Sequence, residues 1–556
     1  MRIAVLVAAL VGCGGSPSSD EDPGHSVTTP VGSSPCLPSG PEVCDGLDND
    51  CDGLVDDADP DVDWTTGTWF FEDADVDGHG APDSRLQQCA WRRGLAEAGD
   101  DCDDSDEDVS PSALEYCEDG IDNDCRGGDG RCAIGQDVQL TLHAPVTVYT
   151  DERSYLGAAL DGAGDVNGDG YADILIGAPQ MDGDQALSGQ ALVLLGGPLD
   201  GTYHSEQADL RLLGSEMSDY LGTAVVGAGD RDGDGFDDIA VGAPGVDVAG
   251  TDGGAAYVLR GGPEARITLA DDATTSLFGE ELMEAGQSLA SGDIDGSGGP
   301  DLLVGAPLAG TVWMVDETTE GKHFLDNFPR IEGDPSTGHA MVTADFDGDG
   351  MDDLAIGSPD SADGGRVSVF YGPLGGDRTL DDADLAWVGE SDGDRAGSAL
   401  DAADINGNGL PDLAIGADTC DRYRTAAGAV YVVPAHQPGT HALGEASLVV
   451  DGNDYMHMGY AVAAPDDLDV SGRADLVVGS IEANSAFLFY DPEPGNYNIA
   501  DANIAIVGTD LSGRAGSALA SAGDVDGDGA EDLLVGEYLA QDYAGLAFLL
   551  YGGYGQ

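Results

Sequence analysis

Asp165-Val-Asn167-Gly-Asp169-Gly-Tyr-Ala-Asp173-Ile-Leu-Ile-Gly-Ala-Pro179 is the first of seven related segments in this chain of 556 residues. In each segment, a turn rich in Asp, Asn and Gly runs directly into a short apolar stretch. The seven segments start at Asp165, Asp230, Asp293, Asp345, Asp404, Asp467 and Asp524. Such self-similarity at a near-constant period is the sequence signature of a repeat fold.

Each period holds four strand-sized pieces, which in the first period are Leu156–Leu160, Asp173–Gly177, Gln190–Leu195 and Asp209–Leu213. Four strands repeated radially form the blades of a β-propeller. The last period ends after its third piece, and an unassigned strand, Val138–Leu142, precedes the first period. We therefore predict an all-β fold, a seven-bladed β-propeller over 137–556 in which Val138–Leu142 completes the last blade. An open β-solenoid is the alternative.

The seven turns share a pattern of oxygen donors that is typical of a cation site. Side chains at positions 1, 3, 5 and 9 carry oxygen, and position 7 offers its backbone carbonyl. The candidate ligands are Asp165, Asn167, Asp169, Tyr171, Asp173; Asp230, Asp232, Asp234, Phe236, Asp238; Asp293, Asp295, Ser297, Gly299, Asp301; Asp345, Asp347, Asp349, Met351, Asp353; Asp404, Asn406, Asn408, Leu410, Asp412; Asp467, Asp469, Ser471, Arg473, Asp475; and Asp524, Asp526, Asp528, Ala530, Asp532.

Hard oxygen ligands in this number favour Ca²⁺ over softer metals and over Mg²⁺. The loops are not EF-hands, because position 12 is Ile176 in the first loop and Val535 in the last, where a Glu would be required. Metal-free turns are the alternative. Affinity is expected to follow the carboxylate count, which makes the loop at Asp404 the weakest site.

The segment from Tyr155-Leu-Gly157 through the Asp165 loop to Gly177-Ala-Pro179 resembles the FG-GAP repeats of integrin α-subunit propellers and of many bacterial secreted proteins. The resemblance covers about 420 residues and implies a seven-bladed propeller with Ca²⁺ between the first two strands of a blade. Ligand binding of the integrin type does not carry over, because nothing here matches a partner domain.

Residues 36–136 form a Cys- and Asp-rich stretch that resembles the MopE-like metal-binding motif of bacterial secreted proteins. Its candidate ligands are Asp48, Asp50, Asp52, Asp56, Asp73, Asp75 and Asp77. A second copy of the motif is spoiled by Arg126. The alternative is a disulfide spacer with solvated acids. Eight cysteines predict a disulfide framework, with Cys44 and Cys51 as one local pairing.

The N-terminus predicts export. Residues 1–12 have the charge and apolar run of a secretory signal, and Leu10-Val-Gly-Cys13 resembles a bacterial lipobox, with Cys13 as the lipidated residue. An ordinary signal or a misplaced start codon are the alternatives. Residues 13–35 are expected to be a flexible tether. Longer apolar runs that would cross a membrane are absent from the sequence.

Charge limits the possible partners. Acidic residues number 106 and basic residues 20, a formal net charge of −86. Nucleic-acid and anionic-membrane binding both need clustered Lys and Arg, so we expect no nucleic acid and membrane contact only through a lipid anchor. Gly389-Glu-Ser391-Asp-Gly393 matches a nucleophile motif but lies in a polar loop, and we predict no enzyme.

We therefore predict a calcium-binding adhesion or recognition scaffold at the bacterial surface, with an extracellular protein or glycan as its partner. A polysaccharide-acting enzyme and a structural envelope protein are the alternatives.

Overall fold

The structure is a computed structural model, and the chain divides into two compact units, which are described separately. The first unit holds the described residues up to 105, and the second holds those from 138 onward. The described residues are 41, 43–44, 49, 51, 54, 56, 62–75, 79–82, 84–89, 92, 95–96, 98–99, 101–105, 138–140, and 144–553 without 184, 249, 263–265, 363, 423–424 and 510–511.

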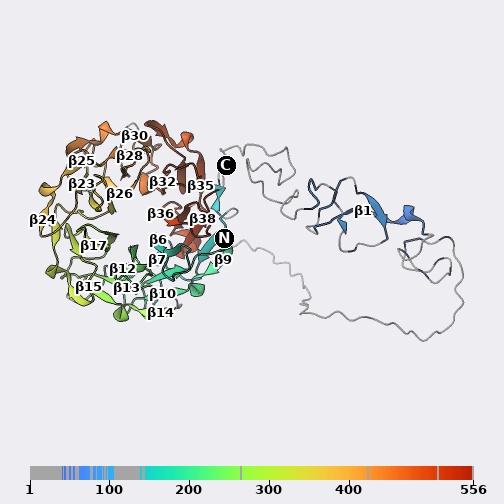
Figure 1. The fold of residues 1–556 in the computed structure, drawn as a ribbon, viewed down its shortest axis with the longest axis horizontal. Helices are drawn as coiled ribbons and strands as arrows, with labels where there is room; N and C mark the ends of the chain where they lie inside the picture. The colour runs from blue at the N-terminus through green and yellow to red at the C-terminus, as the bar shows by residue number, and fades with distance from the viewer. Residues whose placement is uncertain are drawn as a thin grey trace, which may run out of the picture. The chain divides into compact units, whose positions relative to one another are not determined.

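The second unit is a ring of seven antiparallel sheets, each extended at its outer edge by a parallel fifth strand (Figure 1). The innermost strands surround the centre of the ring. They are β6 (Ala159–Gly164), β11 (Val225–Gly229), β16 (Ser288–Gly292), β21 (Met341–Ala344), β26 (Ala396–Ala403), β31 (Met458–Ala463) and β36 (Ala518–Gly523). The predicted seven-bladed propeller is confirmed.

Second and third strands form the middle of each blade. The second strands are β7 (Asp173–Ala178), β12 (Asp238–Ala243), β17 (Asp301–Ala306), β22 (Asp353–Ser358), β27 (Asp412–Ala417), β32 (Leu476–Ser480) and β37 (Asp532–Glu537). The third strands are β8 (Gln190–Leu194), β13 (Ala255–Leu259), β18 (Thr311–Val315), β23 (Arg366–Phe370), β28 (Ala429–Pro434), β33 (Ser485–Phe489) and β38 (Leu546–Leu550). Their apolar runs are buried on both faces, because each blade is sandwiched between two others.

The outer part of each blade comes from two chain segments. The fourth strands are β10 (Leu210–Leu213), β15 (Thr275–Phe278), β20 (Arg330–Glu332), β25 (Leu385–Val388), β30 (Leu448–Asp451), β35 (Ile504–Val507) and β5 (Val146–Tyr149). The fifth strands are β14 (Arg266–Leu269), β19 (Gly321–Phe324), β24 (Arg378–Thr379), β29 (Gly439–Ala442), β34 (Gly495–Asn498), β4 (Val138–Gln139) and β9 (Gly201–His204), each supplied by the next blade.

Short helices connect these elements. A 3-10 helix joins a fifth strand to the fourth strand that follows it, at η3 (Ser205–Gln207), η4 (Ala270–Asp272), η5 (Leu325–Asn327), η6 (Leu380–Asp382), η7 (Leu443–Glu445) and η8 (Ile499–Asp501). The helix α2 (Ala540–Tyr543) lies between β37 and β38. Within the described part of the chain, no helix has the length and apolar character needed to cross a membrane.

The ring closes differently from the prediction. The strand that completes the last blade is β5, which pairs antiparallel with β38. The predicted closing segment contributes β4, which pairs in parallel with β35 of the sixth blade. The cause is a unit that repeats along the chain and consists of an outer strand, a short connector and a fourth strand. In every copy the outer strand pairs with the sheet of the preceding blade, while the fourth strand pairs within its own blade. The sequence pattern did not reveal this fifth strand.

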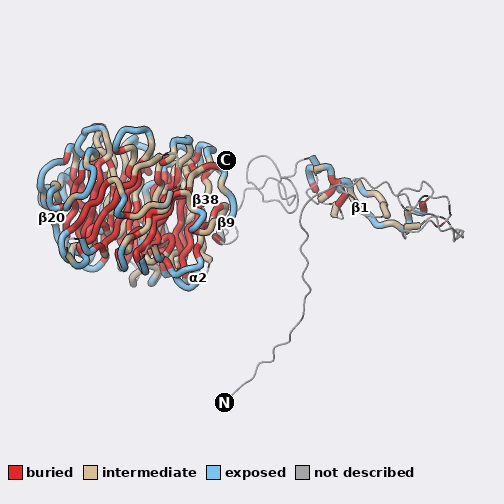
Figure 2. The backbone as a smooth tube through the Cα atoms, turned by 90° about the horizontal axis from the view of Figure 1, so that it is seen from below, coloured by how far each residue is buried: buried red, intermediate tan, exposed pale blue. Residues whose placement is uncertain are grey.

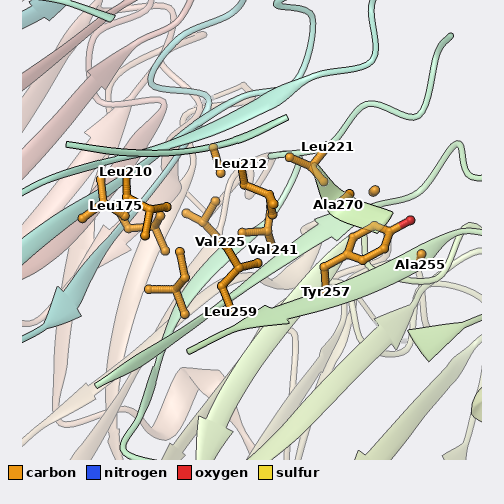
Figure 3. Close-up of a cluster of buried hydrophobic side chains, with 14 of the residues drawn as sticks. Leu175, Leu210, Leu212, Leu221, Val225, Val241, Ala255, Tyr257, Leu259 and Ala270 are labelled. Carbon is orange, nitrogen blue, oxygen red and sulfur yellow. The ribbon is translucent and has the colours of Figure 1, made fainter. Parts of the chain in front are cut away.

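Apolar side chains between adjacent blades hold the ring together. Between the first two blades, Leu175 and Leu212 pack with Val225, Val241 and Tyr257 in one buried cluster (Figure 3). The second strands are buried along their length, the third strands almost entirely so, whereas the loops at both ends of the blades are exposed (Figure 2). The loops, the innermost strands and the outer strands are therefore available for ligands.

The first unit is small. It contains η2 (Trp64–Thr66) and a sheet of β1 (Thr68–Glu72), β2 (Leu86–Gln88) and β3 (Leu95–Ala96). Cys44 forms a disulfide with Cys89, so the predicted local pairing of Cys44 with Cys51 is wrong. The strand β1 pairs with both β2 and β3, so segments that are distant in sequence lie side by side. An argument from the local spacing of cysteines could not predict this.

Candidate metal centres

The seven predicted loops join the first strand of each blade to the second. Six position-nine aspartates open the second strand, and Asp475 directly precedes β32. Each loop connects the same two antiparallel strands of its blade, and such a connection lies at one end of the pair. All seven loops therefore lie at the same end of the ring. We call this end the Asp-loop face, and the opposite end the mouth face.

The fourth loop shows how the backbone holds the carboxylates. Asp345 accepts hydrogen bonds at Oδ1 from the N–H groups of Gly348, at 2.8 Å, and Asp349, at 3.0 Å, and at Oδ2 from Gly350, at 2.9 Å. At the other end of the loop, Asp353 accepts from Phe346 N–H at 2.9 Å. Gly350 has a φ of +90°, which glycine adopts without strain. The turn therefore fixes both carboxylates before any ligand arrives.

Several loops bring three carboxylates to one point, with one oxygen of each lying within 4.8 Å of the others. These groups are Asp230, Asp232 and Asp234; Asp293, Asp295 and Asp301; Asp345, Asp347 and Asp353; and Asp467, Asp469 and Asp475. Like charges this close repel one another unless a proton or a cation intervenes. The grouping matches the predicted ligands at positions 1, 3, 5 and 9.

Burial is the largest cause of a raised pKa at every position-nine aspartate. The pKa values rise to about 6 at Asp173, Asp238, Asp353 and Asp412, and to about 7 at Asp301, Asp475 and Asp532. Nearby loop carboxylates raise them further. A bound cation would offset this cost of burying negative charge.

The third loop offers a direct test of whether a cation fits. Asp293 Oδ2 accepts from Gly298 N–H at 2.9 Å, but its buried Oδ1 has no hydrogen-bond partner. A buried carboxylate oxygen without a partner is costly. Because the donors around it are all oxygen, a hard divalent cation suits the position.

Two loops depart from this arrangement in ways the sequence did not show. In the fifth loop, Asn406 donates from Nδ2 to both oxygens of Asp412 at 2.6 Å, so an amide already occupies both oxygens of this predicted ligand. In the second loop, Arg260 Nε lies 2.7 Å from Asp232 Oδ2. An internal cation thus holds one predicted ligand of a loop with four carboxylates.

The first unit contains one more acidic group. Asp73 and Asp75, both predicted ligands, lie with Asp104, which also accepts from Ala74 N–H at 2.8 Å. Asp104 belongs to an acidic run 30 residues further on, and no local motif pointed to it. Of the other predicted ligands in this unit, Asp56 lies within the described residues. Cys13, Asp48, Asp50, Asp52 and Asp77 lie outside the described residues.

The mouth face carries a polar and aromatic group that the sequence reasoning missed. Arg395 Nη1 donates to both oxygens of buried Asp418 at 3.0 Å. Arg514 Nη1 donates to the Tyr538 hydroxyl at 2.9 Å. Tyr460 lies close enough to both arginines for them to influence its pKa.

One repeat position would have revealed this group. A glycine lies at or just before the start of each innermost strand. The residue two positions before this glycine is Tyr155, Tyr220, Glu284, Ser336, Arg395, His457 or Arg514. Their φ values lie between 51° and 76°, a left-handed conformation that glycine tolerates better.

Comparison with known proteins identifies two kinds of repeat. The model described as "FG-GAP repeat" matches residues 157–194, 222–259, 337–370 and 396–433, in the first, second, fourth and fifth blades. The model described as "Putative metal-binding motif" matches residues 36–57 and 101–129. The chain therefore contains FG-GAP repeats and copies of this metal-binding motif, as the sequence predicted.

Relatives include integrin alpha chains and a phospholipase D. Integrin alpha-PS2 of Drosophila melanogaster is 30% identical over 228 residues, 37% of this chain and 16% of that protein. Integrin alpha-4 of Xenopus laevis is 37% identical over 188 residues, 33% of this chain and 17% of that protein. Phosphatidylinositol-glycan-specific phospholipase D of Rattus norvegicus is 34% identical over 154 residues, 26% of this chain and 18% of that protein. The chain thus matches less than a fifth of the length of each.

Proposed function

We propose that this chain is an extracellular recognition scaffold whose propeller is stabilised by Ca²⁺ and whose ligand is a protein or a glycan. The FG-GAP repeats and the integrin alpha relatives support recognition in general. The lipidation of Cys13 and a place on the bacterial envelope belong to the same proposal. They rest on the signal-like N-terminus.

Calcium binding is proposed on the basis of the Asp loops. The single observation that carries it is the convergence of three carboxylates in loop after loop on the Asp-loop face. Cation binding there would tie together the first two strands of a blade. In the first unit, Asp73, Asp75 and Asp104 would hold a further cation in the same way.

The mouth face is the proposed binding surface. Exposed apolar side chains occur there in the first three blades, at Met217, Val248, Leu282 and Leu308, which are 60% to 66% exposed. All four lie in turns that join second to third strands or one blade to the next. We propose these turns as contacts of a protein ligand, because burying exposed apolar side chains favours association.

The test measures binding of the full chain, in Ca²⁺, to a panel of immobilised extracellular proteins and glycans. Substitutions Met217→Asp and Leu282→Asp should weaken binding of a protein ligand. Phe324→Asp is the control, because Phe324 is 47% exposed on the outer strand β19. No binding to any member of the panel, or equal loss in all three variants, would contradict the proposal.

An enzyme that acts on polysaccharide is the second candidate. The observation that favours it is the meeting of His339, Arg395, Asp418 and Tyr460, which combines acid, base and aromatic groups on one face. Mass spectrometry of a polysaccharide panel after incubation with the chain would detect shortened products. Their appearance, and its loss in Asp418→Asn, would replace the scaffold proposal with this one.

A further inference from the structure

A cavity of about 310 Å³ opens at the centre of the ring on the mouth face. The beginnings of the innermost strands of all seven blades line it. Most of the lining side chains are small or aliphatic, and His339 and Tyr460 are the large polar ones among them. The cavity is therefore a cup lined mainly by small side chains, in which His339 of blade four and Tyr460 of blade six are the large polar groups.

Arg395 does not line the cavity, but it lies close enough to His339 and Tyr460 to affect the pKa of both, and its guanidinium is held in place. Both oxygens of Asp418 accept from Nη1 at 3.0 Å, and Asp360 lies 3.6 Å from Nε. Asp418 is buried, whereas about a third of the Arg395 side chain is exposed. Arg395 thus offers donors in a fixed plane, with little conformational entropy left to lose on binding.

Arg514 forms a second fixed group one blade further from Tyr460. Its Nη1 donates to Tyr538, and its Nη2 lies 3.6 Å from Glu482. The ring of Tyr538 packs edge-on against Tyr155, with 5.4 Å between the ring centroids. Two aromatic rings, one from blade seven and one from blade one, therefore lie beside Arg514.

Tyr460 and His339 complete the group as uncharged donors and acceptors. Tyr460 is 37% exposed, and burial is the largest cause of its raised pKa. Burial, and then Arg395, lower the pKa of His339. Both side chains are therefore neutral at pH 7, and the imidazole offers one donor and one acceptor.

The backbone at the same position indicates that these side chains are retained at a cost. Arg395 and Arg514 have φ values of 60° and 61°, a conformation that is strained for residues other than glycine. The chain has 86 glycines, yet none of the seven blades places one there.

Charge selects the class of ligand. The acids Asp418, Asp360 and Glu482 already balance the two arginines, so the group offers hydrogen bonds without a net positive charge. The whole chain carries a formal charge of −86 and repels polyanions. Planar donors, neutral hydroxyl partners and exposed aromatic rings suit a polyol with an apolar face, which describes an uncharged sugar.

We propose that the cup on the mouth face binds a neutral saccharide, with Arg395, Tyr460 and Arg514 as its contacts. This inference rests on the proposed recognition function and names its ligand class.

Isothermal titration of the full chain in Ca²⁺ tests the inference. The probes are neutral oligosaccharides of glucose, xylose, mannose and galactose, with oligogalacturonate and heparin fragments as acidic comparisons. At least one neutral probe should bind. Tyr460→Ala and Arg514→Gln should each weaken it about tenfold, as loss of a central contact does, whereas Phe324→Ala on the outer strand β19 should leave Kd unchanged. Thermal melting of each variant in Ca²⁺ controls for folding.

Four results would overturn the inference: no saccharide binds, only acidic probes bind, Kd is the same in Tyr460→Ala and Arg514→Gln as in the unaltered chain, or Phe324→Ala weakens binding as much as they do. If no saccharide binds, this result is compared with the binding of the chain to the protein panel described above. If immobilised proteins still bind, the recognition function stands and only the saccharide site falls. If neither class binds, both fall.

Discussion

Asp237 Oδ2 accepts a 2.8 Å hydrogen bond from the backbone N–H of Asp165, which opens the Asp loop of the preceding blade. The N–H of Asp237 in turn donates to the Asp165 carbonyl at 3.2 Å. Asp352 repeats the arrangement, accepting from Asp293 N–H at 2.9 Å. Neighbouring loops are therefore bonded directly, so that ordering one loop should help to order the next.

Removing this link should weaken two loops at once. Asp237→Ala leaves the Asp165 N–H without its side-chain acceptor, and we expect a loss of about 1–3 kcal/mol in the free energy of unfolding. Chemical denaturation of the metal-free chain measures it. Asp272→Ala, an exposed acid in η4, is the control. Equal effects of the two substitutions would show that Asp237 acts only through overall charge.

Arg260 should act as a competitor for calcium in the second loop. Its Nε holds Asp232 at 2.7 Å, so Arg260→Gln should free a ligand and raise the Ca²⁺ affinity of that loop severalfold. Site-resolved titration by NMR detects the change. Lys322→Gln removes a positive charge that contacts Asp271 instead and should have no such effect. Lower affinity in Arg260→Gln would contradict this reading.

The fifth loop should fill last. Only two of its four side-chain donors are carboxylates, and Asn406 already bonds both oxygens of Asp412. Asn406→Asp should raise Ca²⁺ affinity about tenfold and lower stability in chelator, because the added charge repels Asp412. The same titration compares the two chains. A fifth loop that fills before the others would refute the ranking by carboxylate count.

Asp161 should make stability fall as pH rises. Burial is the largest cause that raises its pKa from 3.8 to about 7, and its Oδ2 accepts from Gly227 N–H at 2.9 Å. Between these two pKa values the folded chain binds more protons than the unfolded chain, so the free energy of unfolding decreases with pH.

Asp161→Asn removes this titration and keeps an acceptor. The variant should match the unaltered chain below pH 4 and exceed it increasingly up to about pH 7, with a constant gain above that. Melting temperatures across this range, with Asp200→Asn as an exposed control, measure the difference. A gain that is the same at every pH would exclude the ionisation of Asp161 as the cause.

Local patterns predicted much of the fold. The aspartate spacing located the seven loops, and the apolar runs that follow located the second strands, because both depend on short-range geometry. The fifth strands escaped prediction because each pairs with another blade. The outer strand β9, for example, pairs with β5, which lies 50 or more residues earlier. The closing strand was misplaced for the same reason.

Side-chain partners that lie far apart in the sequence were also beyond the reach of prediction. The spacing of the second loop gave no sign that Arg260 would hold Asp232, 28 residues away. The pairing of Arg395 with Asp418 depends on the turn between β26 and β27 returning the chain to the mouth face. Carboxylate counts could rank the loops only as isolated turns.

Thermal unfolding of the metal-stripped chain, with Ca²⁺ titrated in and Mg²⁺ as the comparison, tests the central claim most directly. If the Asp loops bind Ca²⁺ in the folded state alone, the melting temperature should keep rising with the logarithm of Ca²⁺ concentration above the Kd. Mg²⁺ should produce a much smaller rise, because it dehydrates reluctantly. The same melting temperature in chelator and in saturating Ca²⁺ would mean that the loops are metal-free turns and would contradict the account.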